Sequence, residues 1–501
     1  MSVEHSPPLA RTGIPGLDDV LGGGLHATRS FLIEGSPGAG KTTVALQFLL
    51  EGAENGERGL YITLSETEAE LREGAASHGW HIGEQIDVFE LIPPESLIDP
   101  DQQQSLLYSS DLELGETMKH MFDAVERANP KRIVVDSLSE IRLLAQSSLR
   151  YRRQILQLRH YFAGKGATVL LLDDLTSEAS DRMVHTIVHG VIGLEQVTPD
   201  YGAQQRRLRI IKQRGQAFRG GYHDFVIRTG GVAVFPRLVA AEHHIAFSRD
   251  PLGSGIEGLD ALLGGGVERG SSTLIMGPSG AGKSLFALQF IKQALERGER
   301  AAMFVFDEEL NLLLDRAEVL GFPLREYRDE GRLHIEQVDV AELSPGEFAH
   351  RVRMKASEPR VRTVVIDSMN GYMIAMPEVT ALLLHIHELL QSLNRQGTNT
   401  FVTLAQHGLV GEMHSPVDLS FLADTIVVLR YFEAQGQVRR AVSIIKKRSG
   451  AHETTIREFL IGARGLTLGA PLQAFDGVLL GTPRYRGEDQ PLLAPEPSGD
   501  A

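Results

Sequence analysis

The chain of 501 residues contains no cysteine. It can therefore form neither disulfides nor thiolate metal sites, and nothing in it indicates an oxidising compartment. The N-terminal segment "MSVEHSPPLARTG" has no apolar core of signal-peptide length, and no later run approaches the ~18 apolar residues that a membrane span requires. The chain's formal net charge of −15 opposes non-specific attraction to nucleic acid or to an anionic membrane. We therefore expect a cytoplasmic protein without a membrane partner, for which nucleic acid is a disfavoured ligand.

What the sequence does contain is a long internal repeat. The segment "TGIPGLDDVLGGGL" at Thr12 returns in similar form 242 positions later, and so does the glycine-rich "GSPGAGKT" at Gly35. A period of this length is too long for a solenoid and indicates two tandem globular domains.

The repeat sets the expected domain limits. We predict a first domain over residues 1–245, a second over 246–470, and a partly disordered tail over 471–501, which ends in a segment rich in proline and acidic residues. The first copy has extra residues before its "VVDS" motif. We assign this insertion to a polar surface loop at 93–111.

Short apolar runs alternate with helical patterns in each copy. The runs "SFLIEG", "LYITLS", "RIVVDS" and "TVLLLDD", and their counterparts "TLIMGP", "MFVFDE", "TVVIDS" and "TFVTLAQ", have the length of buried strands. Strands that alternate with helices indicate a parallel sheet covered on both faces. The sequence therefore predicts an α/β fold with two tandem domains, each a mainly parallel, helix-covered sheet.

Each copy carries the P-loop pattern G-x-x-x-x-G-K-[ST] between an apolar strand and a helix. The glycines let successive backbone N–H groups face phosphate oxygens, and the following helix adds its positive N-terminal dipole. Lys41 and Lys283 would reach the β- and γ-phosphates, while Thr42 and Ser284 would ligate Mg²⁺. We therefore predict that both copies bind ATP with Mg²⁺. The predicted nucleotide-binding residues are Gly35, Ser36, Pro37, Gly38, Ala39, Gly40, Lys41, Thr42 and Thr43 in the first copy, and Gly277, Pro278, Ser279, Gly280, Ala281, Gly282, Lys283, Ser284 and Leu285 in the second.

Acidic residues follow the predicted strands near each P-loop. Asp136 and Asp367 each end an apolar strand, where a carboxylate can hold the Mg²⁺ shell. Glu66 and Glu308 follow the strand after the P-loop helix, where a glutamate can orient and deprotonate the attacking water. The second copy adds Asp307 where the first has serine, which suggests different chemistry or speed at the two sites. The predicted metal ligands are Thr42, Asp136, Ser284 and Asp367, and the predicted catalytic acids are Glu66, Asp307 and Glu308.

These motifs resemble the KaiC family of RecA-like ATPases. The resemblance covers about residues 10–480 and includes the "G-[IL]-x-G-L-D-x-[LV]-L-G-G-G" segment, both P-loops, the strand-end acids and a late "K-x-R" in each copy. It implies two tandem RecA-like P-loop NTPase domains in a hexameric, double-layered ring with nucleotides between protomers. It also implies a role in signalling or timing.

Four cations match, by position, the residues that reach the adjacent protomer's nucleotide in that family. They are Lys212 and Arg214 in the first copy and Lys446 and Arg448 in the second. A cation that arrives from a neighbour neutralises charge that develops on the γ-phosphate. The resemblance therefore implies that these four residues are catalytic in trans.

The resemblance also implies that the second domain phosphorylates itself on neighbouring serine and threonine residues. In the matching segment "DLSFLADTIVVL", Ser420 keeps the serine, but Phe421 stands where the threonine would be. We therefore expect at most one acceptor here. The C-terminal stretch "PLQAFDGVLLGTP" resembles the segment by which a regulatory protein partner biases the ring.

Two other functions stay open at this point. A DNA-dependent RecA-like motor or recombinase is supported by "LRYRRQILQLRHYF" at 149–162, which is basic with interleaved aromatics. A regulatory scaffold that binds ATP with little turnover is the other alternative. His385 and His387 are spaced so that they point to different helix faces, and we expect a packing or surface role for them rather than a metal site.

Overall fold

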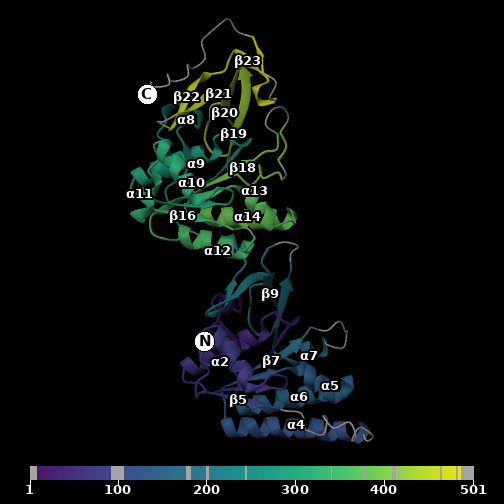
Figure 1. Cartoon of the computed structure of the whole chain (residues 1–501). Coiled ribbons are helices and arrows are strands. Elements are labelled where there is room, and N and C mark those ends of the chain that lie inside the picture. The colour runs from purple at the N-terminus through teal and green to yellow at the C-terminus, as the bar shows by residue number, and fades with distance from the viewer. Residues whose placement is uncertain are drawn as a thin grey trace, which may run out of the picture. The chain divides into compact units, whose positions relative to one another are not determined.

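The computed structural model describes residues 8–91, 106–175, 182–198, 202–242, 245–339, 341–376, 379–408, 413–415, 417–462, 465–480 and 483–486. The chain divides into two compact units, Met1–Arg237 and Leu238–Ala501 (Figure 1). The domain limits inferred from the repeat, at residues 245 and 470, remain predictions.

The first unit is built on one nine-stranded sheet with the order β11-β10-β9-β8-β3-β7-β6-β4-β5. Its strands are β1 (Leu9–Ala10), β2 (Leu25–His26), β3 (Ser30–Gly35), β4 (Gly59–Thr63), β5 (Ile86–Glu90), β6 (Arg132–Asp136), β7 (Thr168–Asp174), β8 (Gly190–Val197), β9 (Gln205–Gln213), β10 (His223–Arg228) and β11 (Gly231–Phe235). Its helices are α1 (Leu17–Val20), α2 (Lys41–Glu54), α3 (Glu68–Ser77), α4 (Leu106–Ala128), α5 (Leu138–Ala145), α6 (Ser148–Lys165) and α7 (Arg182–Ile187).

The second unit repeats this order with β16-β15-β17-β18-β14-β19-β20-β21-β22, read from the opposite edge. Its strands are β12 (Pro251–Leu252), β13 (Val267–Glu268), β14 (Ser272–Gly277), β15 (Arg300–Val305), β16 (Leu333–Gln337), β17 (Val361–Asp367), β18 (Asn399–Ala405), β19 (Thr425–Ala434), β20 (Gln437–Lys447), β21 (Arg457–Gly462), β22 (Gly465–Pro471), β23 (Phe475–Asp476) and β24 (Arg484–Tyr485). Its helices are η4 (Ala240–Glu242), α8 (Glu257–Leu262), α9 (Lys283–Glu296), α10 (Leu310–Val319), α11 (Leu324–Asp329), α12 (Pro345–Ala356), α13 (Met369–Ala375), α14 (Val379–Arg395) and η5 (Val478–Leu480).

Each main sheet is mostly parallel and lies between two apolar cores. In the first unit, β3 pairs in parallel with β7 and β8, whereas β8 through β11 are antiparallel. Side chains alternate along β3, so Phe31 and Ile33 enter the core that includes α2, and Leu32 enters the core that includes α6. The predicted α/β fold of two tandem RecA-like domains is thereby confirmed. No helix in the described part of the chain is long and apolar enough to cross a membrane.

The predicted surface loop at 93–111 is wrong at its C-terminal end. Helix α4 begins at Leu106, so the last residues of that segment are helical, while residues 92–105 lie outside the described part of the chain. Further along α4, Leu114, Met118 and Met121 are buried in the core at helical spacing. An apolar face of this kind stabilises a long helix through tertiary packing.

Part of the predicted tail is folded. Strand β23 pairs with β24, and Val478 is buried beside Phe432 and Leu472. These contacts attach the segment to the second unit. The predicted disorder falls on residues 487–501, which lie outside the described residues.

The two histidines of α14 have different surroundings. His385 Nδ1 and the Tyr372 hydroxyl lie 2.5 Å apart, whereas His387 is exposed. Burial lowers the pKa of His385 to about 4. Among the described residues, no group of three or more histidine or acidic side chains is placed to hold a metal ion.

The depressed pKa of His385 predicts a pH-dependent stability of the second unit. In the unfolded chain His385 has a pKa near 6.5 and binds a proton at a higher pH than in the folded chain. The free energy of unfolding should therefore fall as the pH is lowered from about 6.5 to 4, by up to about 3 kcal/mol. His385→Gln keeps a polar side chain beside Tyr372 and removes the titration. Its unfolding free energy, measured with urea across this range, should fall less than that of the parent; parallel curves would contradict the assignment.

Candidate functional site

The first P-loop joins the central strand β3 to α2. A Cβ added at Gly35 would lie 2.7 Å from the Leu194 carbonyl oxygen, and one at Gly40, where φ is 100°, would lie 2.5 Å from Ile227 Cδ1. Only glycine fits such close approaches without strain. Among the described residues, no side chain caps the N-terminus of α2, so its first N–H groups are available to an anion.

The second P-loop has the same geometry between β14 and α9. A Cβ at Gly277 would lie 2.7 Å from the Leu429 carbonyl oxygen, and one at Gly282, where φ is 103°, would lie 2.9 Å from Ile461 Cδ1. In the described part of the chain, the N-terminus of α9 also has no side-chain cap. Both loops therefore have a geometry that fits a phosphate group.

The two P-loop lysines have different partners. Lys41 Nζ donates to the carbonyls of Gly35 at 2.9 Å and Ser36 at 3.2 Å, and it forms an ion pair with Asp174 Oδ1 at 2.7 Å. Lys283 Nζ donates only to backbone carbonyls among the described residues, those of Gly277 at 3.1 Å and Pro278 at 2.8 Å. Sequence reasoning assigned both lysines but missed Asp174.

The predicted metal ligands of the first unit lie together. Thr42 Oγ1 donates to Asp136 Oδ2 at 3.3 Å, and the Tyr61 hydroxyl donates to the same oxygen at 2.6 Å. Burial raises the pKa of Asp136, and these two hydrogen bonds oppose the shift. A hydroxyl beside a strand-end carboxylate is a donor set that suits Mg²⁺ when phosphate oxygens complete it. Asp136 and Thr42 therefore fit the predicted role.

In the second unit, Asp367 accepts a hydrogen bond from Thr403 Oγ1 at 2.5 Å. Asp367 and Ser284 line the same cavity, of about 350 Å³, together with Lys283, Asp307 and Glu308. A cavity of about 340 Å³ in the first unit is lined by Thr42, Thr43 and Glu66. Each unit thus gathers its predicted P-loop, metal and acidic residues at one edge of the sheet.

The acids that could orient water are held differently in the two units. Glu308 Oε2 accepts a hydrogen bond from Arg316 at 2.8 Å, and burial raises the Glu308 pKa while Arg316 opposes the rise. The pKa of Glu66 is raised by burial and by the charges of Asp136 and Glu70.

Asp307 accepts a hydrogen bond from the hydroxyl of Ser368. Arg316 lies on α10, the helix that follows these acids. Sequence reasoning missed it because no motif links it to Glu308.

The four cations predicted to act in trans lie away from the P-loop of their own unit. Lys446 pairs with Ile426, which pairs with Leu274 near the start of β14, whereas the P-loop begins at Gly277. Three residues of strand separate these positions, which corresponds to about 10 Å. The structure therefore does not bring these cations to their own nucleotide site.

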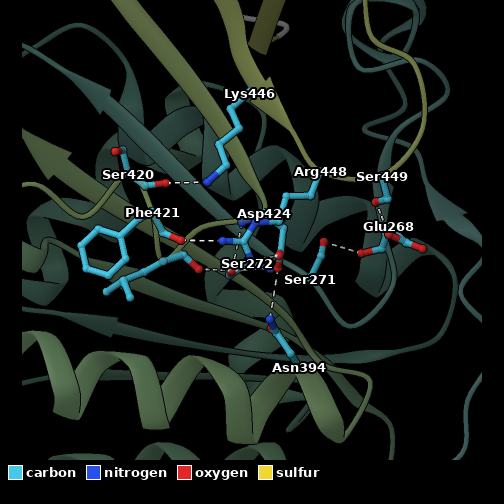
Figure 2. Close-up of polar contacts among 11 residues, drawn as sticks. Glu268, Ser271, Ser272, Asn394, Ser420, Phe421, Asp424, Lys446, Arg448 and Ser449 are labelled. Atoms are coloured by element: carbon cyan, nitrogen blue, oxygen red, sulfur yellow. Dashed lines mark hydrogen bonds and ion pairs between the residues drawn. The ribbon is translucent and has the colours of Figure 1, made fainter.

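In the second unit the cations contact the segment before β19. Figure 2 shows Lys446 directed at the Ser420 carbonyl, 2.8 Å away, and Arg448 directed at the Phe421 carbonyl, 2.6 Å away. Arg448 also lies 3.3 Å from Asp424, which accepts hydrogen bonds from Ser272.

The first unit has the same arrangement. Lys212 donates to the carbonyls of His185 and Val188, and Arg214 donates to the Thr186 carbonyl at 2.9 Å.

The basic segment 149–162 offers few aromatics to a nucleic acid. Tyr151 and Phe162 are buried in the core, and the Tyr161 hydroxyl donates to the Phe122 carbonyl and to Glu126. Stacking on bases requires exposed rings. The interleaved aromatics that supported a DNA motor are therefore core residues set at helical spacing.

Known proteins match almost the whole chain. A family profile described as "ATPase: KaiC" matches residues 10–239 and 252–473. The circadian clock protein KaiC3 of Synechocystis sp. is 28% identical over 96% of this chain and 95% of its own length. The circadian clock oscillator proteins KaiC of Prochlorococcus marinus (strain MIT 9313) and Synechococcus elongatus are 27% and 26% identical, over 98% and 94% of this chain and 97% and 91% of their own lengths. Two complete P-loop sites on repeated sheets, matched in both copies by this profile, show that the chain belongs to the KaiC family of ATPases.

Proposed function

We propose that both units bind Mg·ATP and that the chain hydrolyses it. The observation that supports this most is that each unit brings its P-loop, a strand-end aspartate and a glutamate to one edge of the sheet. In the second unit Ser284, Asp367 and Glu308 line one cavity, and in the first unit Thr42 lines a cavity with Glu66 and donates a hydrogen bond to Asp136. A purely structural glycine-rich turn does not account for a helix N-terminus without a side-chain cap that lies beside two carboxylates, whereas an anion-binding site does.

The roles follow from position. Lys41 and Lys283 bind the β- and γ-phosphates, and the P-loop N–H groups orient them. Thr42 with Asp136, and Ser284 with Asp367, hold Mg²⁺, whose contribution is to neutralise charge on the phosphates. Glu66 and Glu308, with Asp307 beside Glu308, orient the attacking water and accept its proton.

Replacing one P-loop lysine should empty one site only. Lys41→Ala and Lys283→Ala should each halve the number of nucleotides bound per chain, because each removes the cation at one cradle. Equilibrium dialysis with Mg·ATP measures this number, and Lys119→Ala, at an exposed position of α4, is the control. A double variant that binds ATP like the parent would contradict both assignments. Full binding without release of ADP would identify a scaffold rather than an ATPase.

We propose further that the chain assembles into a ring, a hexamer by analogy with the family, in which Lys212, Arg214, Lys446 and Arg448 reach the neighbouring nucleotide. Support comes from their distance from their own P-loop and from their contacts with backbone carbonyls, which an incoming phosphate can replace. A cation that completes a site only on assembly makes hydrolysis depend on the ring.

Mixed protomers test the trans role. In a Glu66→Gln background that silences the first unit, Glu308→Gln and Arg448→Ala should each abolish turnover. Equal mixtures of the two should regain about one quarter of the rate of the Glu66→Gln protein, because about one interface in four then combines an intact Glu308 with an intact Arg448. A protomer with both changes, mixed with Glu308→Gln, should regain nothing. Normal hydrolysis by monomeric Arg448→Ala would rule out the trans role.

We also propose that the second unit transfers a phosphoryl group to Ser420. The bond from the γ-phosphorus to the β-bridging oxygen breaks, a bond to Ser420 Oγ forms, and the hydroxyl proton passes to Glu308 or Asp307 of the neighbour. Ser420 lies on the segment that Lys446 and Arg448 hold in Figure 2. A phosphate there would add about −1.5 to −2 charge beside these cations.

Mass spectrometry of peptides after incubation with Mg·ATP should find one phosphate, on Ser420, because Phe421 has no hydroxyl. Ser420→Ala should remove it and leave ADP release within about twofold of the parent. ADP release without phosphate on Ser420 would show an ATPase that is not a kinase.

Because the relatives are clock proteins, we propose nucleotide-dependent signalling or timing as the role, with a regulatory partner at the C-terminal segment that β23 and β24 form.

A further inference from the structure

The two nucleotide sites differ at one position that the sheet register defines. In the first unit, Gly35 pairs across the sheet with Asp174, the last residue of β7. In the second unit, Gly277 pairs with Ala405, the last residue of β18. The residue beside the first P-loop glycine is therefore an aspartate in one copy and an alanine in the other.

Asp174 uses this position to hold the P-loop lysine. Its Oδ1 lies 2.7 Å from Lys41 Nζ, and the exposed fractions of the two side chains are 10% for Lys41 and 42% for Asp174. Lys283 forms no ion pair within the described part of the chain, since a methyl group occupies the corresponding place. The lysine of the first site is thus already neutralised before a phosphate arrives.

The surrounding structure fixes the backbone from which the Asp174 side chain extends. The Asp174 N–H lies 3.4 Å from Ser139 Oγ, which donates to Asp173 Oδ1 at 2.8 Å. Asp173 is buried and pairs with Arg142 on α5. Because neighbouring strand residues point to opposite faces, Asp173 packs against α5 while Asp174 turns to the P-loop.

We propose that Asp174 is a specificity-determining residue that weakens the preference of the first site for a triphosphate over a diphosphate. A nucleotide must displace the Asp174 carboxylate from Lys41, and the displaced charge stays beside the place of the γ-phosphate. Mg·ATP carries one more negative charge than Mg·ADP, so this carboxylate opposes the triphosphate more strongly. At the second site no carboxylate is paired with Lys283 in the described part of the chain, and Asp307, which lines that cavity, accepts a hydrogen bond from Ser368 instead. This inference rests on the proposed nucleotide binding and adds an inequality between the two sites.

The test isolates each site and exchanges the two residues. In a Lys283→Ala background, the first site is titrated with Mg·ADP and with the magnesium complex of AMP-PNP, a non-hydrolysable triphosphate, both competing against a fluorescent ADP. Asp174→Asn, which keeps the shape and removes the charge, should raise the affinity for AMP-PNP relative to ADP by roughly threefold to tenfold. In a Lys41→Ala background, Ala405→Asp should lower the same ratio at the second site. Asp87→Asn on β5, which removes an exposed ion pair with Arg58, is the matched control and should change neither ratio.

The outcomes separate this inference from the function on which it rests. An unchanged or lower ratio in Asp174→Asn, with both nucleotides still bound, overturns the role of Asp174 alone. A fall in turnover per bound ATP with an unchanged ratio would make Asp174 a catalytic acid instead and also overturns the inference. A first site that binds neither nucleotide in the Lys283→Ala background overturns the proposed function together with the inference. If Ala405→Asp does not fold, by its thermal unfolding, the Asp174→Asn ratio decides.

Discussion

The central strand of each sheet, β3 or β14, is hydrogen-bonded to a parallel strand on both sides, and the rest of each site depends on this constraint. A strand held on both sides ends where its neighbours end, at the edge formed by the carboxyl ends of the strands. There the chain turns sharply at Gly35 or Gly277 into the next helix. The carboxyl ends of the neighbouring parallel strands meet at that edge. A helix N-terminus, a lysine and several carboxylates therefore share a small space. Such a combination of donors and carboxylates suits an anion with bound cations.

Within this shared frame, the two units place their ion pairs on different groups. The first unit pairs its P-loop lysine, Lys41, with Asp174. The second unit leaves Lys283 to backbone carbonyls and pairs the strand-end acid Glu308 with Arg316. A carboxylate on the lysine acts on nucleotide affinity, whereas an arginine on the acid acts on the proton acceptor. Two copies of one fold can therefore differ in chemistry without any change in the P-loop itself.

The sheet also explains why the late cations lie away from the P-loop of their own unit. Strands β9 and β20 run antiparallel to their neighbours, so the late cations lie near the start of the central strand rather than at the P-loop edge. In the isolated chain they bind carbonyls of the segment before β8 or β19, and Asp424 holds Arg448 there. These contacts keep the charges ordered at the surface. In the second unit they also link Lys446 and Arg448 directly to the segment that carries Ser420.

The sequence by itself determined the repeat, the α/β class, both P-loops and the strand-end acids, because these depend on local spacing. Glycine positions, a following helix and an apolar strand that ends in aspartate are visible without any long-range contact. Local pattern failed at the start of α4: the stretch assigned to a loop for its polar, proline-bounded composition ends in the first turns of a helix, whose Leu114 and Met118 are buried in the core.

Only the tertiary structure decided the partners of the functional groups. Asp174 is 133 residues from Lys41 and reaches it because β7 lies beside β3 in register. Arg316 reaches Glu308 from helix α10, and Tyr61 reaches Asp136 because β4 and β6 are neighbours. Ion pairs and hydrogen bonds of this kind depend on distances that strand order sets. The sequence therefore specified the chemistry of each site, and the packing of the sheet set the differences between the two.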